Sequence, residues 1–364
     1  MPNPKTKSKP KPLLDRARQL ADEGALEQLR QLRSVSAKVA QLQMQLKLEQ
    51  RKREQAEAEL SEAEHWREFL ASVSSLETDV RIKPPKRGKG GRTQTTPIIC
   101  CCDWHTEQEV DPRTVNGVNE FNLEIARTRI TRLWHKAVYF INLWKELADI
   151  HDAVLWLGGD LISGSIHEEL QEVNQLGPVD ATSLVVDHVT AGIHYLLEQG
   201  NLDRVHVVCN IGNHGRTVKK PRHATAFQHS YESSAFLRIQ DRCHNMAEVT
   251  WQIGRAYHAY LMLYDRWQSR FHHGDNIRYY GGVGGITIPV NKAIAEWNKM
   301  RHADVDIFGH WHQYLEAWNF VACGCLVGFD PFAVSIKASY QPPTQTIVFL
   351  DSEKGKVGAI PLFV

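Results

Sequence analysis

Residues 96–105 read TPIICCCDWH, an apolar run that ends in Asp103-Trp104-His105. Apolar runs of this length between polar stretches are typical of buried strands. Four later segments follow the same pattern and also end in metal-ligating residue types: AVLWLGGD at 153–160, RVHVVCNIGNH at 204–214, SRFHHGD at 269–275 and DVDIFGHWH at 304–312. Because ligands converge at the carboxyl ends of strands in α/β sheets, we expect these five ends to meet in one site.

The side chains at these ends are carboxylates, an amide and imidazoles, with no thiolate among them. Nitrogen and oxygen donors of this kind bind manganese, iron or zinc, and affinity order alone does not choose between these metals. One Asp-x-His pair is a common surface or core feature, so a single segment predicts little. Five segments in one order are much harder to produce by chance, and together they predict a metal centre.

In this order the segments resemble the motifs of the calcineurin-like metallophosphoesterase superfamily: Asp103-x-His105, Gly159-Asp160, Gly212-Asn213-His214, His273-Gly274 and Gly309-His310-x-His312. The resemblance covers residues 98–320. Gly-Asn-His-Gly-Arg at 212–216 and Asp-Leu-Ile-Ser-Gly at 160–164 are similar to phage and bacterial members near the DNA-repair exonuclease branch. The resemblance implies an α/β fold in which two sheets form a sandwich with flanking helices, and it implies hydrolysis of phosphate esters.

The resemblance also implies a role for each residue of the site. Carried over position by position, it gives one metal ion to Asp103, His105 and His312, a second to Asn213, His273 and His310, and the bridging position to Asp160. Manganese is the metal that we expect, with iron or zinc as alternatives. A hydroxide held between two such ions can attack phosphorus in line.

Two histidines of these segments need a choice. His272 and His273 are adjacent, and adjacent strand residues face opposite sides. The residue before the glycine matches the motif, so we expect His273 at the metal. His214 is expected beside the metals, where it stabilises the phosphate oxygens or protonates the leaving oxygen. A structural histidine bonded to backbone is the alternative, and Gly215 stands where many relatives carry an acid, so the sequence names no orienting partner for His214.

The chain divides into four expected parts: a basic disordered tail at 1–24, a long helix at 25–78, a basic flexible linker at 79–97 and a phosphoesterase domain at 98–364. The tail is rich in Lys and Pro, whereas the helical part has neither Pro nor Gly. The linker contains RIKPPKRGKGGRTQTTP from Arg81 to Pro97, which holds basic residues and no acid. Segments of this composition do not pack a core.

Apolar residues in the N-terminal helix recur three and four positions apart, at Leu32, Val35, Val39, Leu42 and Leu46. This spacing is the a/d seam of a coiled coil, so we expect a homodimer through this helix. The seam is interrupted where its register continues onto Glu49 and Arg53. The alternative is a single amphipathic helix that packs against the catalytic domain.

Within the phosphoesterase domain, hydrophobic periodicity predicts helices at 122–150, 184–199 and 291–300. Strands in a hairpin are expected at 251–273, and a terminal hairpin at 346–364 that turns at 353–355. The 364 residues with 42% hydrophobic content support a sizeable core. The net charge of +1 produces no global field that would identify a partner.

The sequence predicts a cytoplasmic protein that does not enter a membrane. No apolar run approaches the length of a membrane span, and the N-terminus has no hydrophobic signal core. The seven cysteines contain no Cys-x-x-Cys pair, and Cys100, Cys101 and Cys102 lie inside an apolar run as small hydrophobic residues. An odd number of cysteines without a regular framework favours a reducing compartment.

The loop after His214 indicates the substrate. It places four cationic side chains beside the expected site, namely Arg216, Lys219, Lys220 and Arg222. A solvated surface loop is the alternative, but this position favours a polyanionic substrate. We therefore expect a DNA nuclease whose basic tail and linker contact the phosphate backbone. A phosphatase or cyclic-nucleotide phosphodiesterase is the second hypothesis, and a nucleic-acid-binding scaffold is the third.

Overall fold

The computed structural model describes residues 38, 42–47, 49–50, 52–53, 81–82, 92–278 and 285–364. The chain divides into two compact units, Met1–Val73 and Ser74–Val364. The described residues of the first unit are helical and exposed, and the seam residues Leu42 and Leu46 are 58% and 60% exposed. The tail expected at 1–24 and the other seam residues lie outside the described residues.

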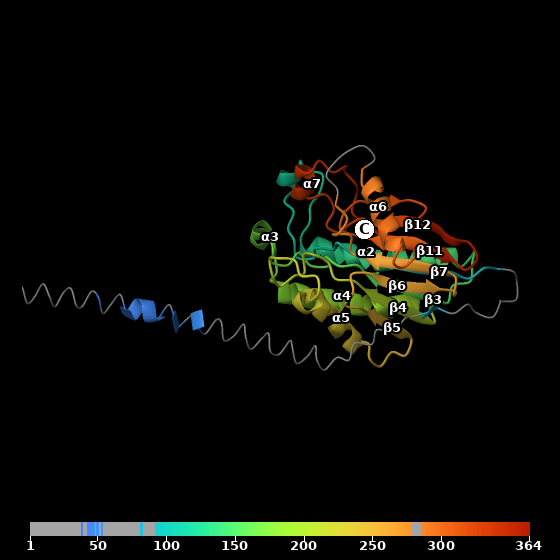
Figure 1. Cartoon of the computed structure of the whole chain (residues 1–364), viewed down its shortest axis with the longest axis horizontal. Coiled ribbons are helices and arrows are strands. Elements are labelled where there is room, and N and C mark those ends of the chain that lie inside the picture. Colours follow the sequence, from blue (N-terminus) through green and yellow to red (C-terminus); the bar gives the residue numbers. More distant parts are fainter. Residues whose placement is uncertain are drawn as a thin grey trace, which may run out of the picture. The chain divides into compact units, whose positions relative to one another are not determined.

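The described residues of the second unit form two mixed six-stranded sheets. Several strands of these two sheets are labelled in Figure 1. The first has the order β1 (Arg81–Ile82), β6 (Ala259–Leu263), β7 (Trp267–His272), β8 (Val305–Phe308), β10 (Phe320–Ala322) and β9 (Leu315–Glu316). The second has the order β12 (Gly355–Phe363), β11 (Thr344–Asp351), β2 (Thr95–Cys101), β3 (Asp152–Leu157), β4 (Arg204–Cys209) and β5 (Val249–Ile253). Strands β2 to β5 are parallel, as are β7, β8 and β10.

Alternate residues of strand β2 enter two different cores. Ile98 of β2 packs with Leu261 and Ile307 of the first sheet, so the two sheets share one apolar layer. The next residue, Ile99, packs in a second core that contains the helices. Both faces of β2 are therefore covered, which explains why its sequence is continuously apolar where a half-exposed strand would alternate.

Helices cover the outer faces of both sheets. Three pack on the second sheet: α2 (Leu123–Trp144), α4 (Pro178–Gln199) and α5 (Tyr231–Arg242), of which α4 and α5 are seen beside β4 and β5 in Figure 1. Helix α6 (Thr287–Asn298) packs on Phe308 and Phe320 of the first sheet. The short helices are η1 (Pro112–Val115), α3 (Glu168–Val173), η2 (Phe227–His229) and α7 (Pro331–Ser335). The α/β class predicted from the sequence is confirmed.

Local sequence determines where the predicted helices begin. Asn122 precedes α2, and its Oδ1 atom accepts a hydrogen bond from the amide of Ile125 at 3.0 Å, a common helix N-cap. Helix α2 stops at Trp144, shorter than predicted, and α4 begins at Pro178, six residues earlier than predicted. Proline suits that first position because it has no amide hydrogen to leave unpaired. The two predicted hairpins are present as β6–β7 and β11–β12.

The flexible linker predicted at 79–97 is wrong at both ends. Arg81–Ile82 forms β1, which pairs in parallel with β6, and the side chain of Ile82 is only 2% exposed between the sheets. Residues 95–97 already belong to β2. An isolated apolar residue in a basic segment gave no sign that it would extend a sheet. Residues 83–91 lie outside the described part of the chain.

Within the described ranges, no helix has both the length and the apolarity of a membrane span.

Candidate metal centre

The five predicted segments form loops at one end of the two sheets. Each follows the carboxyl end of a strand: β2, β3 and β4 in the second sheet, and β7 and β8 in the first. Backbone hydrogen bonds connect these loops, from the amide of Asp103 to the carbonyl of Gly159 at 3.0 Å and from Gly309 to His273 at 2.9 Å. The structure therefore brings together residues that are more than two hundred positions apart in the sequence.

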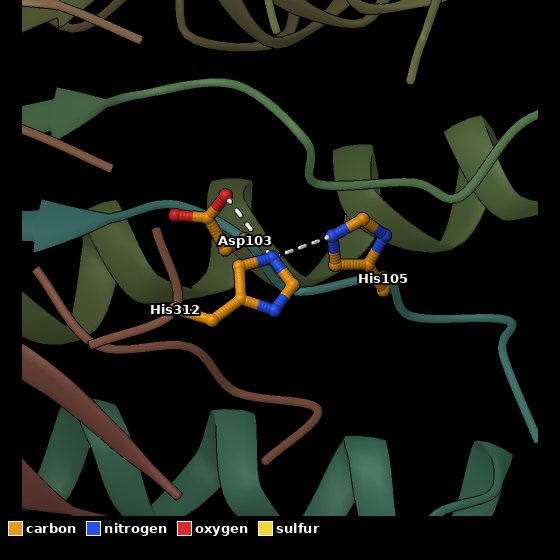
Figure 2. A group of neighbouring side chains, drawn as sticks. All are labelled: Asp103, His105 and His312. Atoms are coloured by element: carbon orange, nitrogen blue, oxygen red, sulfur yellow. Dashed lines mark hydrogen bonds and ion pairs between the residues drawn. The ribbon is translucent and has the colours of Figure 1, made fainter. Parts of the chain in front are cut away.

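The first donor group contains Asp103, His105 and His312 (Figure 2). The Nε2 atom of His312 lies 3.6 Å from Oδ1 of Asp103 and 3.2 Å from Nε2 of His105. Asp103 and His105 are buried, whereas His312 is partly exposed. Figure 2 shows the ring of His312 between the other two side chains. One ligand atom from each residue lies within 4.8 Å of the others, which is close enough for a shared cation.

The second donor group contains Asp160, His273 and His310. The Nε2 atom of His273 lies 2.9 Å from Oδ2 of Asp160 and 3.0 Å from Oδ1 of Asn213. The other ring nitrogen, Nδ1, lies 2.9 Å from the carbonyl oxygen of Gly158, which fixes the plane of the ring. A backbone carbonyl on the second nitrogen is the usual way in which a metal-ligating histidine is oriented.

Asp160 also belongs to a third group, with His105 and His214. Among the described residues, Asp160 is therefore the one carboxylate that belongs to two of these groups. One group contains His105, an expected ligand of the first metal ion, and the other contains His273 and His310, expected ligands of the second. Two carboxylates, one amide oxygen and several imidazoles, most of them buried, fit a divalent cation of the first transition row. These buried His and Asp groups can hold metal ions.

His272 faces away from this site. Its ring stacks on Phe308 at a centroid distance of 5.1 Å, and its Nε2 atom lies 3.4 Å from Oδ1 of Asp306. The alternation of side chains along a strand separates it from His273, which begins the loop after β7. The structure therefore places His273, and not His272, among the donor groups.

His214 lies at the edge of the donor groups and is partly exposed. Its amide donates a hydrogen bond to Oδ1 of Asp160 at 2.7 Å, and its Nδ1 atom lies 3.3 Å from the carbonyl oxygen of Ser163. Its ring meets that of His105 edge-on at 4.8 Å. The Ser163 carbonyl is thus the orienting partner that the sequence did not name.

Most of the expected ligands have a left-handed backbone conformation. The residues with positive φ are Asp103, His105, Asp160, His310 and His312, at 48° to 70°. Such conformations are uncommon for residues other than glycine, and they cluster at functional sites where the surrounding structure holds them in place. In His310 and His312 the turn directs two imidazoles that are two residues apart toward different carboxylates.

Two glycines of the motifs are required by space. A Cβ atom on Gly212 would lie 2.1 Å from Oδ1 of Asp160, and one on Gly309 would lie 2.3 Å from Oδ2 of Asp103. Real Cβ atoms do not make such contacts. The absence of a side chain at these two positions therefore allows the loops to approach the two carboxylates.

Opposite charges stabilise one another in the buried centre. Burial raises the pKa of Asp160, but the charges of His273 and His214 outweigh burial and hold that pKa well below its usual range. Burial lowers the pKa of His273, whereas Asp160 raises it, to about 10 overall. Burial and the charge of His273 lower the pKa of His310 to about 4. The centre therefore contains ionised carboxylates, which favour bound cations.

Sequence reasoning missed two buried carboxyl groups that support the loops. Glu232 accepts hydrogen bonds from the amides of Leu161 at 2.7 Å and Gly212 at 2.6 Å, so it joins the loop of Asp160 to that of Asn213. Burial and the charge of Asp160 raise the pKa of Glu232 to about 8. Glu232 lies outside every motif, and its only signal is that it is the first acid after a basic loop.

Glu107 is the second missed carboxyl group. It accepts a hydrogen bond from the amide of Gly164 at 2.9 Å, and burial raises its pKa to about 7. Its one indication in the sequence is its position two residues after His105. A loop that holds a buried metal ligand is not where an exposed acid would be expected. It connects the loop after β2 to the loop after β3.

The four predicted substrate residues have different surroundings. Arg216 is half-buried, two residues after His214, and its charge acts on His167. Lys219 forms an exposed ion pair with Glu168, with Nζ and Oε1 2.6 Å apart. Lys220 and Arg222 are exposed and form no ion pair within the described part of the chain. Of the four, Arg216 is the nearest to His214 in the chain and the one whose side chain is half-buried.

Compared with profiles of known protein families and with functionally characterised proteins, the chain matches none at a significant level. A function is therefore inferred from the donor groups themselves and from the loops that hold them. Their residue types, their burial and their position at the carboxyl ends of five strands are the observations that a proposed function has to explain.

Proposed function

We propose that this protein is a metal-dependent phosphoesterase that uses two divalent cations to hydrolyse phosphodiester bonds. One observation carries the proposal: the donor groups of Asp103 and of Asp160 adjoin at the ends of two sheets, and Asp160 belongs to more than one group. Two cations that share a carboxylate are a common arrangement in phosphatases and nucleases. The order of the segments, which resembles that of the calcineurin-like metallophosphoesterases, supports the same reaction.

The donor set supports the choice of metal. Imidazoles and carboxylates together suit manganese, iron or zinc, and manganese is our choice for the assayed enzyme. When bound, two such cations polarise the phosphoryl oxygens and ionise a water molecule at neutral pH. The chain itself holds the donors in place. The lack of a side chain at Gly212 and at Gly309 lets the loops approach the carboxylates, and Glu232 accepts hydrogen bonds from two loop amides.

His214 would supply the proton for the leaving oxygen. A carbonyl oxygen only accepts hydrogen bonds, so the contact with Ser163 requires a proton on Nδ1 of His214. A second proton on Nε2 makes the ring a general acid, and loss of that proton leaves the Ser163 contact intact. Asp160 accepts from the amide of His214 and fixes the position of the residue.

DNA is the substrate that we favour. Arg216, Lys220 and Arg222 carry positive charge on the loop that follows His214, and phosphate contacts of this kind depend on charge. A phosphatase or cyclic-nucleotide phosphodiesterase would share the donor groups but would not need this loop. A scaffold that only binds nucleic acid would not need the donor groups.

The exposed Leu42 and Leu46 favour a homodimer through the helix, and seven free cysteines favour the cytoplasm.

A substrate panel tests this proposal. The full chain, freed of metal and then supplied with manganese, is assayed on bis(p-nitrophenyl) phosphate, p-nitrophenyl phosphate, a cyclic nucleotide, and single- and double-stranded DNA. We expect hydrolysis of the generic diester and of DNA only after manganese is supplied. Hydrolysis of the monoester or the cyclic nucleotide alone would favour the second hypothesis, and DNA binding without hydrolysis of any ester would favour a scaffold.

A further inference from the structure

A row of imidazoles leads from the buried centre to the surface. The ring of His214 lies 4.8 Å from that of His105 and 5.0 Å from that of His167. His105 is buried, His214 is partly exposed and His167 is exposed. His105 and His214 belong to a donor group that contains Asp160, whereas His167 belongs to none of the groups found among the described residues. His167 is therefore one ring farther from the metal centre than His214.

Arg216 adds a positive charge to the outer end of this row. Its Nε atom is buried without a hydrogen-bond partner, and its guanidinium forms no ion pair with the described residues. The base of its loop is held by hydrogen bonds from Thr217 to His229 and from Tyr231 to Gly215, at 3.0 and 2.8 Å. A buried Nε–H group without a hydrogen-bond partner is unfavourable, so this position is suited to an acceptor such as an anion from outside the chain.

The surroundings of His167 agree with an anion site. Partial burial and the charges of His214 and Arg216 lower the pKa of His167, although the charge of Asp160 acts in the opposite direction, so cationic groups outweigh the carboxylate at this ring. The nearby Lys219 differs, because Glu168 already pairs with it. An arginine binds phosphate through two parallel N–H groups, and a neutral imidazole can donate one further hydrogen bond.

We propose that His167 and Arg216 bind a second phosphate of the substrate, next to the phosphate under attack, so that the preferred substrate is a polynucleotide strand. This inference rests on the proposed phosphodiester hydrolysis, which places the phosphate under attack at the metals and His214. His167 lies outward from His214, where a bound polynucleotide would continue toward solvent. A single-phosphate substrate would fill the metal centre and leave Arg216 without a partner.

The test compares substrates of equal length that differ in one charge. The thymidine trinucleotide TpTpT has two charged phosphates. The two positional isomers of its analogue with a single methylphosphonate have one charged phosphate at the same length. We expect the full chain with manganese to cleave TpTpT with a kcat/KM about tenfold above the better isomer, the size of one charged hydrogen bond. In His167→Ala and in Arg216→Ala this ratio should fall toward one. Arg216→Lys should retain part of this ratio, because the positive charge remains although the two parallel N–H groups of the guanidinium are lost.

A binding measurement separates this inference from the proposed function. The Kd of a fluorescein-labelled thymidine hexanucleotide, measured by anisotropy, should rise about tenfold in each alanine variant. The matched controls are His194→Ala on α4 and Arg127→Ala on α2, two exposed residues, and both variants should keep the Kd and the charge ratio of the parent chain. Weaker binding by the site variants of a chain that hydrolyses no ester would keep the subsite and reject the phosphoesterase.

Two results would overturn the subsite. The first is an unchanged Kd for the hexanucleotide in both alanine variants. The second is a loss of kcat/KM on the one-phosphate isomers that equals the loss on TpTpT, because the two residues would then act on the phosphate under attack. Circular dichroism and metal content of the variants identify any loss that comes from misfolding, and Arg216→Lys provides the conservative variant in that event.

Discussion

The Oδ2 atom of Asp160 lies 2.9 Å from the Nε2 atom of His273, although the two residues follow strands of different sheets. Asp160 lies in the loop after β3, and His273 begins the loop after β7. Both are buried, and each shifts the pKa of the other toward its charged form. The contact therefore joins the two halves of the sandwich at the point where the expected cations would bind.

Space at Gly212 gives a first prediction. In Gly212→Ala the added methyl group would lie 2.1 Å from Oδ1 of Asp160, so the carboxylate has to move. We expect manganese affinity, measured by calorimetric titration, to fall about 10- to 100-fold, as for other losses of support around a metal. Gly358→Ala is the control, because no atom lies within 4 Å of its Cβ position. Equal affinities for the two variants would contradict the close approach.

Glu232 gives a second prediction, about stability. Glu232→Ala removes the acceptor of two buried amides, and each unpaired donor costs about 1–3 kcal/mol, so the free energy of unfolding should fall by about 2–6 kcal/mol. Glu232→Gln keeps an acceptor oxygen and should lose less. Urea unfolding measures both, with the exposed Glu198→Ala as control. An alanine variant as stable as the glutamine variant would show that these hydrogen bonds do not hold the loops.

His214 gives a third prediction. Because we place it beside the metals, His214→Ala should keep the metal content of the parent chain and lower turnover of a generic diester by a factor of about 10²–10⁴. Its proximity to His105 and Asp160 also permits direct ligation. Metal analysis together with kinetics decides between these roles, since loss of a metal ion in this variant would show that His214 is a ligand.

His206 gives a fourth prediction, on pH. This buried ring connects β4 to β5, because its Nδ1 atom lies 2.5 Å from Oγ1 of Thr250. Burial lowers the pKa of His206 to about 4. The unfolded chain then binds a proton at a higher pH than the folded chain. The stabilisation is present above pH 6.5 and is lost as the pH falls toward 4, by up to about 3 kcal/mol.

Urea unfolding of the parent chain and of His206→Asn across this range tests the prediction. The variant lacks the titrating group, so the difference in unfolding free energy between the two proteins should change steadily from pH 7 to pH 4. A difference that stays constant with pH would show that the protonation of His206 does not affect stability. This residue is outside the donor groups, so the result does not depend on metal.

The sequence predicted the strands well where both faces are buried. The continuous apolar runs before Asp103, Asp160 and Asn213 predict β2, β3 and β4, and the polar residue types at their ends predict where the donors meet. Ile82 was missed because a two-residue edge strand has no periodicity to detect. Its place depends on pairing with β6, where its partner Leu263 is 181 residues away in the chain.

The supporting residues of the centre could not be predicted in the same way. Glu232 matters because folding brings α5 against two loops, and nothing in the local sequence distinguishes it from an exposed acid. His167 likewise gains its neighbour His214 only through the loop after β3. Residue type and order therefore predict the donors, whereas the groups that hold and extend the site depend on tertiary contacts.

The metal content of Asp160→Ala tests the central claim most directly. The parent chain, reconstituted with manganese and freed of excess metal, should contain about two ions per chain by elemental analysis. Asp160→Ala should lose at least one of these ions and all diester hydrolysis while circular dichroism shows an intact fold, and the exposed Asp241→Ala should behave as the parent. An Asp160→Ala chain that retains two ions and full activity would contradict the assignment of this centre.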